Sequence, residues 1–154
     1  MAEVQLKREL KHRRSIRADG FLREDGLWDI EATMTDIKAY DVYRDFDGSL
    51  VPTGAPFHDI SVALTLDDSF VIQDICVTMD AFPFPNCGQA APNFDVLKGT
   101  RIGPGWHRLV KNQFKEALGC THVLELMPVV ATTAFQTMWQ PLAEKYPQVL
   151  AGWL

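Results

Sequence analysis

One stretch, from Gly119 to Met138 (GCTHVLELMPVVATTAFQTM), constrains the fold of this chain more than any other segment. Its apolar residues recur at the three- and four-residue spacing of an α-helix. They are Val123, Leu126, Met127, Val130, Ala131, Ala134, Phe135 and Met138. A helix with so wide an apolar surface needs a broad partner surface, so the stretch predicts a core helix. We expect Thr121 to be its N-cap and Pro128 to kink or break it.

Two segments before this helix predict the strands that it covers. From residue 27 to 35, the apolar residues Trp28, Ile30, Ala32 and Met34 alternate with polar ones, as in a strand with one buried face. If the strand continues in phase, Asp36 falls on the apolar face, as a pocket acid; if the strand has ended, Asp36 is solvated. Residues 60–66 and 70–79 predict a β-hairpin around residues 67–69. His58 and Asp59 are then expected where its first strand starts.

The remaining segments complete the predicted order of elements. The charged residues 1–17 predict an N-terminal arm or an edge strand. Residues 41–55 predict a loop whose neighbouring aromatic side chains, Tyr40, Tyr43 and Phe46, could cover a pocket. Helices are expected at about 89–97 and at 106–118, the second ended by Gly119 in the C′ position. The sequence therefore predicts a single α+β domain over residues 1–154, with a three- to four-stranded antiparallel sheet and the C-terminal helices packed on one face.

Composition excludes several classes of protein. An apolar content of 47% and a charged content of 23% are ordinary for a folded soluble domain. The net charge of −5 argues against nucleic acid as a partner, and no apolar run is long enough to cross a membrane. Three cysteines without a framework spacing indicate a reducing compartment, so we expect a cytoplasmic protein. A homo-oligomer stays an open expectation.

A small set of polar residues carries the chemistry that we expect. His122 and Glu125 are three apart on the core helix and are neighbours on its surface. A carboxylate beside a histidine orients the ring and suits it to act as a general base. His122 or His58 is the expected base, and Glu125, Asp36 or Asp59 would orient it or act as acid. Histidine, aspartate and cysteine are also zinc ligands, so a metal site is the alternative.

Several motifs resemble one bacterial family. They are Arg23-Glu-Asp-Gly-Leu-Trp-Asp-Ile-Glu-Ala, Thr35-Asp36-x-Lys38, His58-Asp59-Ile60, Pro85-Asn-Cys87, Gly119-Cys120-Thr121-His122-x-x-Glu125-Leu126 and Ala131-Thr-Thr-Ala-Phe-Gln136. This pattern, over about residues 10–140, is similar to the family catalogued as domain of unknown function 2889. Some members are associated with the breakdown of aromatic compounds.

The resemblance implies a small aromatic substrate, with lignin-derived phenols as the expected class. We therefore expect a lyase or isomerase that needs no cofactor, because no cofactor motif is visible. Arg23 or Lys38 would bind a phenolate or carboxylate. The apolar wall would consist of Trp28, Phe57, Phe82 and Phe84.

A more distant resemblance is to the NifU-like iron–sulfur cluster scaffold family, whose fold is a small antiparallel sheet with helices on one side. It rests on the order of Gly54-Ala-Pro-x-x-Asp59, a hairpin, a loop cysteine and a helix opened by cysteine and histidine. The implied ligands are Asp59, Cys87, Cys120 and His122. Phe57 stands where that family has its first ligand cysteine. The alternative function is therefore a zinc or iron–sulfur scaffold or carrier without turnover.

Overall fold

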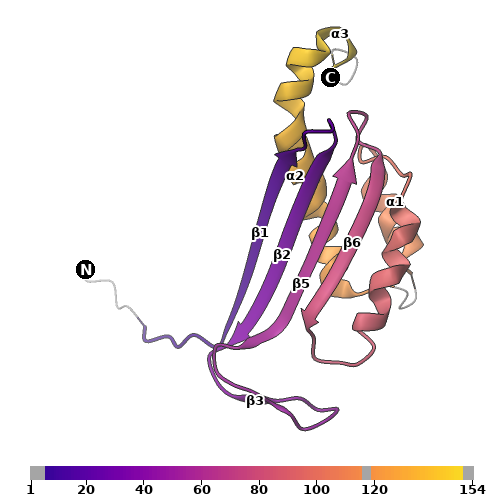
Figure 1. Cartoon of the computed structure of the whole chain (residues 1–154). Helices are drawn as coiled ribbons and strands as arrows, with labels where there is room; N and C mark the ends of the chain where they lie inside the picture. Colours follow the sequence, from indigo (N-terminus) through magenta and orange to yellow (C-terminus); the bar gives the residue numbers. More distant parts are fainter. Residues whose placement is uncertain (1–5, 116–118, 151–154) are drawn as a thin grey trace, which may run out of the picture.

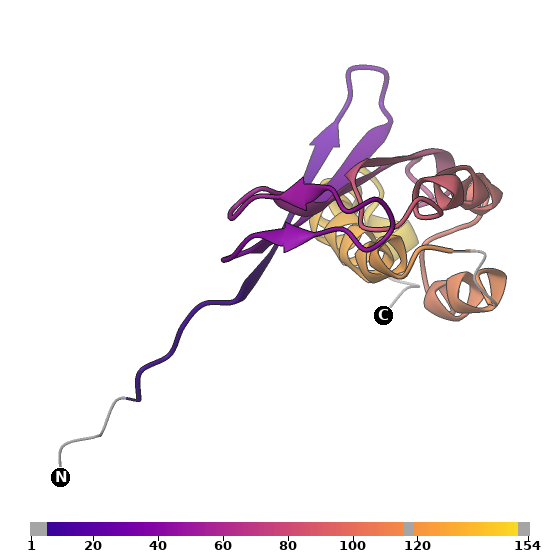
Figure 2. The same ribbon diagram turned by 90° about the horizontal axis from the view of Figure 1, so that it is seen from below.

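The computed structural model describes residues 6–115 and 119–150, which form a four-stranded antiparallel sheet covered by helices on one face (Figure 1). The strand order is β1-β2-β5-β6. The view from below places the helices together on the same side of the sheet (Figure 2). The sheet strands are β1 (His12–Leu22), β2 (Trp28–Lys38), β5 (Pro56–Leu66) and β6 (Ile72–Ala81); the helices are η1 (a 3₁₀ segment, Gly88–Leu97), α1 (Trp106–Gln113), α2 (Thr121–Lys145) and α3 (Pro147–Leu150). The α+β prediction is confirmed.

The register of the two central strands follows from their hydrophobic alternation. Residues directly opposite each other on antiparallel strands share a face of the sheet. Trp28 of β2 stands opposite Leu66 of β5, and Met34 stands opposite Ile60. The same phase continues to the pair Asp36 and His58, both of them buried. A polar pair therefore occupies the last positions of an otherwise apolar face.

Helix α2 covers that face as one continuous helix. It runs through Pro128 and Pro141, so the break that was one expectation at Pro128 does not occur. Its N-cap is Cys120, which has an extended backbone and makes no side-chain cap bond, whereas Thr121 is already helical. The prediction of Thr121 as N-cap was therefore wrong by one residue, because the cysteine supplies the extended conformation that precedes a helix.

A polar tether joins the C-terminal end of α2 to the far end of the sheet. Asp68, in the turn between β5 and β6, accepts hydrogen bonds from Trp28 Nε1 at 2.9 Å, from Lys145 Nζ at 2.7 Å and from Tyr146 Oη at 3.0 Å. The pKa of Asp68 is lowered, because these three donors outweigh burial, which alone would raise it. The tether fixes the helix at the end opposite to Asp36.

Other segments differ from the predictions in detail. Helix α1 ends at Gln113, so Gly119 is not its C′ residue. Residues 116–118, at the end of the predicted helix, lie outside the described residues. Residues 41–55 contain a small two-stranded ribbon of β3 (Val42–Tyr43) and β4 (Leu50–Val51). The aromatic side chains in it and beside it are exposed: Tyr40, Tyr43 and Phe46.

The charged N-terminal region is the edge strand β1, preceded by exposed residues from 6 to 11. Within the described ranges, no helix has the length and hydropathy that a membrane span requires.

Candidate functional site

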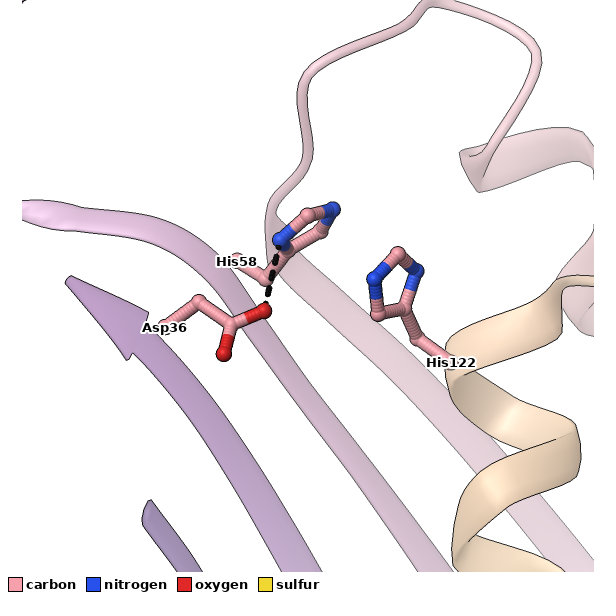
Figure 3. Close-up of side chains that lie close together, drawn as sticks. All are labelled: Asp36, His58 and His122. Carbon is pink, nitrogen blue, oxygen red and sulfur yellow. Dashed lines mark ion pairs between the residues drawn. The ribbon is translucent and has the colours of Figure 1, made fainter. Parts of the chain in front are cut away.

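The polar cluster lies at the end of the sheet where β1 and β5 begin, β2 ends and α2 begins. Asp36 is 1% exposed and His58 is 7% exposed. Among the described residues, these are the two polar or charged ones that are buried. Figure 3 shows His58 above the Asp36 carboxylate, with His122 facing them from the first turn of α2. Strand register thus brings two of the three groups together, and helix packing brings the third.

Asp36 is held by the edge strand. Arg14 of β1, which is directly opposite in the register, donates from Nε and Nη2 to the two carboxylate oxygens, both at 2.8 Å. His12 Nε2 lies 3.3 Å from Oδ1. Burial acts to raise the pKa of Asp36. The hydrogen bonds and the charge of Arg14 act in the opposite direction and outweigh burial, so the pKa lies below its ordinary value. Asp36 is therefore a buried, ionised carboxylate at neutral pH.

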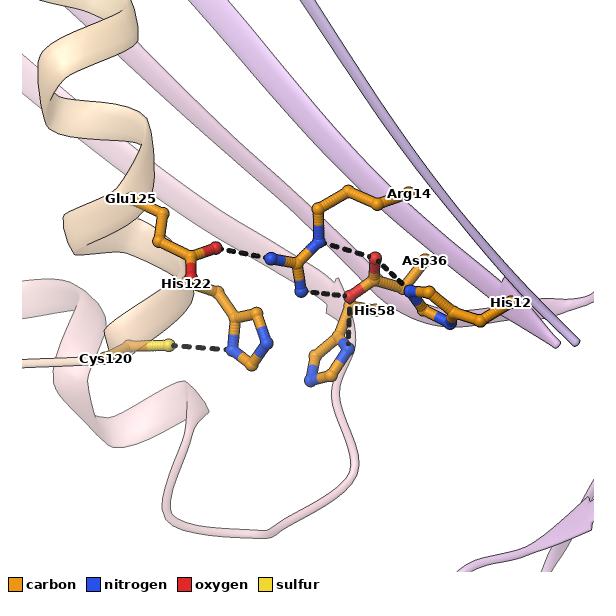
Figure 4. A network of polar contacts seen from close by, with 7 residues as sticks. All are labelled: His12, Arg14, Asp36, His58, Cys120, His122 and Glu125. Atoms are coloured by element: carbon orange, nitrogen blue, oxygen red, sulfur yellow. Dashed lines mark hydrogen bonds and ion pairs between the residues drawn. The ribbon is translucent and has the colours of Figure 1, made fainter.

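Arg14 continues the network to the helix (Figure 4). Its Nη1 donates to Glu125 Oε2 at 2.5 Å. The carboxylate of Glu125 therefore pairs with Arg14 of the edge strand, a partner that its helical spacing from His122 did not predict. This arrangement places two carboxylates around one guanidinium, and the pKa of Arg14 is raised chiefly by its hydrogen bond to Asp36.

His58 is buried without a well-directed partner. Its Nδ1 lies 2.9 Å from Asp36 Oδ2, which is close enough for an ion pair. However, neither ring nitrogen has a hydrogen-bond partner of good geometry among the described residues. Burial, followed by the neighbouring His122, lowers the pKa of His58 to about 4. His58 is therefore a neutral imidazole at neutral pH.

His122 completes the cluster from the helix side. Its ring centroid is 3.9 Å from that of His58, with the planes tilted by 36°. Cys120 Sγ lies 4.0 Å from His122 Nδ1, and the other ring nitrogen lies on the side of His58 (Figure 4). Cys87 is close enough to Cys120 to interact with it electrostatically, but burial is the main reason that the pKa of the Cys87 thiol is raised. Cys87 is thus not an activated thiolate.

The structure does not bring every predicted residue to this cluster. Asp59 alternates with His58 along β5 and is directed to the opposite face of the sheet. Arg23 pairs with Asp25 at the β1–β2 turn, and Trp28 is bound to Asp68. Arg23 and Trp28 are therefore far from the cluster, because the β1–β2 turn and the Asp36–His58 pair lie at opposite ends of the sheet.

Four of the predicted substrate-binding residues do lie at the cluster end. The Phe57 ring contacts His58 edge-on, with centroids 5.3 Å apart, and Lys38 Nζ lies 5.8 Å from the Phe57 centroid. Phe82 and Phe84 follow β6 at this end of the sheet; Phe82 packs beside Gly88, and Phe84 is 54% exposed. These side chains supply aromatic surface and one ammonium group near the cluster.

Sequence reasoning missed two residues of the site, His12 and Arg14. They share a face of β1 with Ile16, a two-residue spacing that was visible in the charged N-terminal run. Nothing local in the sequence showed that this strand pairs with β2 in a register that opposes Arg14 to Asp36.

The cluster offers metal ligands as well as proton acceptors. One ligand atom each from Asp36, His58 and His122 lies within 4.8 Å of the other two. The ligand set implied by the iron–sulfur resemblance is not assembled in the described part of the chain, because Asp59 is on the other face of β5. A separate cavity of 270 Å³ between α1 and α2 is mainly apolar, and no residue of the cluster lines it.

Comparison with known proteins gives one match. A family model described as a protein of unknown function, DUF2889, matches residues 12–136. The chain belongs to the DUF2889 family. No curated protein and no solved structure matches it. The matched range includes all seven residues of the network in Figure 4. The iron–sulfur scaffold resemblance stays a prediction.

Proposed function

We propose that this DUF2889 protein is an enzyme of the lyase or isomerase type that acts on a small aromatic molecule, with lignin-derived phenols as the substrate class. The observation that carries the proposal is the Asp36–His58–His122 cluster at one end of the sheet, in which Asp36 and His58 are buried. Buried ionisable groups placed against one another are typical of catalytic sites. Burying such a group costs stability, and a catalytic role is one reason for a protein to bear that cost.

His122 is the proposed proton acceptor. It is partly exposed, whereas His58 is almost fully buried, so a substrate reaches His122 first. When His122 takes a proton, the Asp36 carboxylate lies within 4.8 Å of a ring nitrogen and stabilises the imidazolium. His58 stays neutral between them and adds no opposing charge. A positioned base of this kind contributes roughly 100- to 10,000-fold in rate.

The surroundings of the cluster support an aromatic, anionic substrate. Phe57 borders His58 and offers a ring edge or face for stacking. Lys38 lies beside Phe57 and could pair with a phenolate or carboxylate. We therefore assign substrate contact to Phe57 and Lys38, and give Arg14 the role of holding Asp36 ionised.

The experiment is a screen of lignin-derived phenols in deuterated water, followed by mass spectrometry. Lyase activity would appear as products, and proton abstraction would appear as deuterium in recovered substrate. On a substrate that reacts, His122→Gln should lower the rate at least about 100-fold. His107→Gln, at an exposed histidine on α1, is the matched control and should change nothing. Full activity in His122→Gln and in His58→Gln would disprove the proposed role of the cluster.

A further inference from the structure

We infer that Asp36, His58 and His122 form a binding site for a first-row divalent metal ion of the zinc class (Figure 3). Two imidazoles and one carboxylate are a ligand set that suits zinc and non-haem iron(II). The inference goes beyond the proposed function and does not rest on it, because it concerns what the cluster binds in the absence of any substrate.

The spacing of Asp36 and His58 fits two neighbouring ligands. Donor atoms about 2.0–2.2 Å from one ion stand about 3.0 Å apart at right angles and about 3.4 Å apart in a tetrahedron. His58 Nδ1 and Asp36 Oδ2 are 2.9 Å apart. The Asp36 carboxylate acts to raise the pKa of His58, yet no hydrogen bond of good geometry joins the two groups, and an ion shared between them would account for the close approach.

The two nitrogens of His58 are an independent reason to expect a ligand. Both are buried and lack a hydrogen-bond partner of good geometry in the described part of the chain. Buried polar atoms in native proteins are nearly always paired, because an unpaired one loses its water without compensation. An ion bound between His58 and Asp36 would satisfy the Nδ1 lone pair.

His122 supplies the third ligand and leaves room for a fourth. All three ligand atoms lie within 4.8 Å of one another, and binding would draw the His122 ring closer to the other two ligands. That ring is partly exposed in the first turn of α2. Three protein ligands with one open position are the usual form of a catalytic zinc site, whereas structural zinc sites are closed by four.

The surrounding groups resemble the supporting shell of a metal site. Ligating carboxylates are normally hydrogen-bonded by a second residue that fixes their orientation. Arg14 donates two hydrogen bonds to Asp36 in this way. Glu125 pairs with Arg14 and offsets its positive charge. The cation would therefore meet a region whose fixed positive charge is already compensated.

This ligand set differs from the one implied by the iron–sulfur resemblance, since it contains no sulfur. Cys120 Sγ lies 4.0 Å from His122 Nδ1, on the side of the ring turned away from His58. The ion would use the same lone pairs that the proposed function assigns to proton transfer. Metal and proton therefore compete for His122, and an acid–base activity should fall when the ion is added.

The test is metal binding by tag-free, chelator-treated protein at neutral pH. Titration calorimetry with Zn²⁺ should give one ion per chain. Affinity should fall at least about 100-fold in His122→Gln, because loss of a ligand should cost no less than the roughly 10- to 100-fold loss seen for residues that support a ligand. His107→Gln and Cys87→Ser should bind as the wild type does. With Co²⁺ as probe, the visible spectrum should show ligation without a thiolate-to-cobalt charge-transfer band.

Three results would overturn the inference. They are no stoichiometric binding, equal binding by His122→Gln, and a thiolate band that disappears in Cys87→Ser. Asp36→Asn provides a second ligand variant, and far-UV circular dichroism checks that each variant is folded. Phenol turnover by a protein that binds no metal would remove this inference and leave the proposed function intact. Metal binding with no turnover of any phenol would do the reverse.

Discussion

Replacing Gly20 with alanine should displace helix α2 from the sheet. A Cβ at position 20 would lie 1.9 Å from Thr137 Oγ1, 2.5 Å from Cγ2 and 2.7 Å from Cβ. Rotation of the Thr137 side chain clears the first two atoms but not its Cβ, so the backbone of α2 or β1 must move. Overpacking of this kind costs about 1–3 kcal/mol, and the contact with a Cβ places Gly20→Ala near the upper end, at about 3 kcal/mol.

Chemical unfolding in urea, followed by circular dichroism, measures this cost. Gly103→Ala is the matched control, because a Cβ there meets nothing within 4 Å and its φ is not positive. Its free energy of unfolding should be unchanged or rise by up to about 1 kcal/mol, because alanine lowers the conformational entropy of the unfolded chain. Adding Thr137→Ala to Gly20→Ala should restore little of the loss, since it removes Oγ1 and Cγ2 but keeps the Cβ that rotation does not clear.

The same variant tests how the site is positioned. Helix α2 carries His122, whose ring lies 3.9 Å from His58 between centroids. A shift of α2 should therefore weaken metal binding as well as stability. If Gly20→Ala is as stable as Gly103→Ala, the close approach of α2 to β1 does not determine the position of the helix, and this reasoning is wrong.

Three further predictions concern charge and thiol chemistry. Arg14→Gln removes the partner of buried Asp36 and should lower the free energy of unfolding by about 2 kcal/mol. This is less than the ~3–5 kcal/mol for a fully buried pair, because Arg14 is 34% exposed. Arg17→Gln, at an exposed pair, should lower it by under ~0.5 kcal/mol in the same urea assay. The pKa of Asp68 is lowered on folding from its ordinary 3.8, so its contribution to stability is present above that value and lost as pH falls through the folded pKa. The difference in unfolding free energy between wild type and Asp68→Asn should therefore shrink in acid and be constant around neutral pH, where Lys145 stays charged. Exposed Cys76 should be alkylated by iodoacetamide faster than Cys87, whose pKa is raised by burial, and a peptide-mass time course with the reverse order would contradict this.

The sequence predicted those parts of the site whose signals are local. Alternation along residues 28–34 put Asp36 on the apolar face in one of the two alternatives that the sequence left open, and the helical spacing after Gly119 placed His122 in the first turn of the main helix. Both signals depend only on side-chain periodicity, which is a property of one element at a time. For the same reason, the hairpin of β5 and β6 was predictable from its two alternating runs and the turn between them.

Residues whose role depends on strand pairing were not predictable in this way. Trp28 and Phe57 were expected on one wall, but antiparallel pairing places them at opposite ends of the sheet. Glu125 was assigned to His122 because of its helical spacing, yet the nearby guanidinium of Arg14, on a strand 111 residues away, is the contact that pairs it. A charge-assisted hydrogen bond between a guanidinium and a carboxylate is stronger than the interaction of a carboxylate with a neighbouring side chain on the same helix surface.

The sequence by itself determined the elements of this protein and the faces that they bury, because hydrophobic periodicity acts within each segment. Only the tertiary structure decided which polar residues meet. The β1–β2 register opposes Arg14 to Asp36, the β2–β5 register opposes Asp36 to His58, and the packing of α2 adds His122. The physical reason is that a one-residue slip of either register would turn these side chains to the other face, and that register is fixed by burial of the whole apolar face of the sheet.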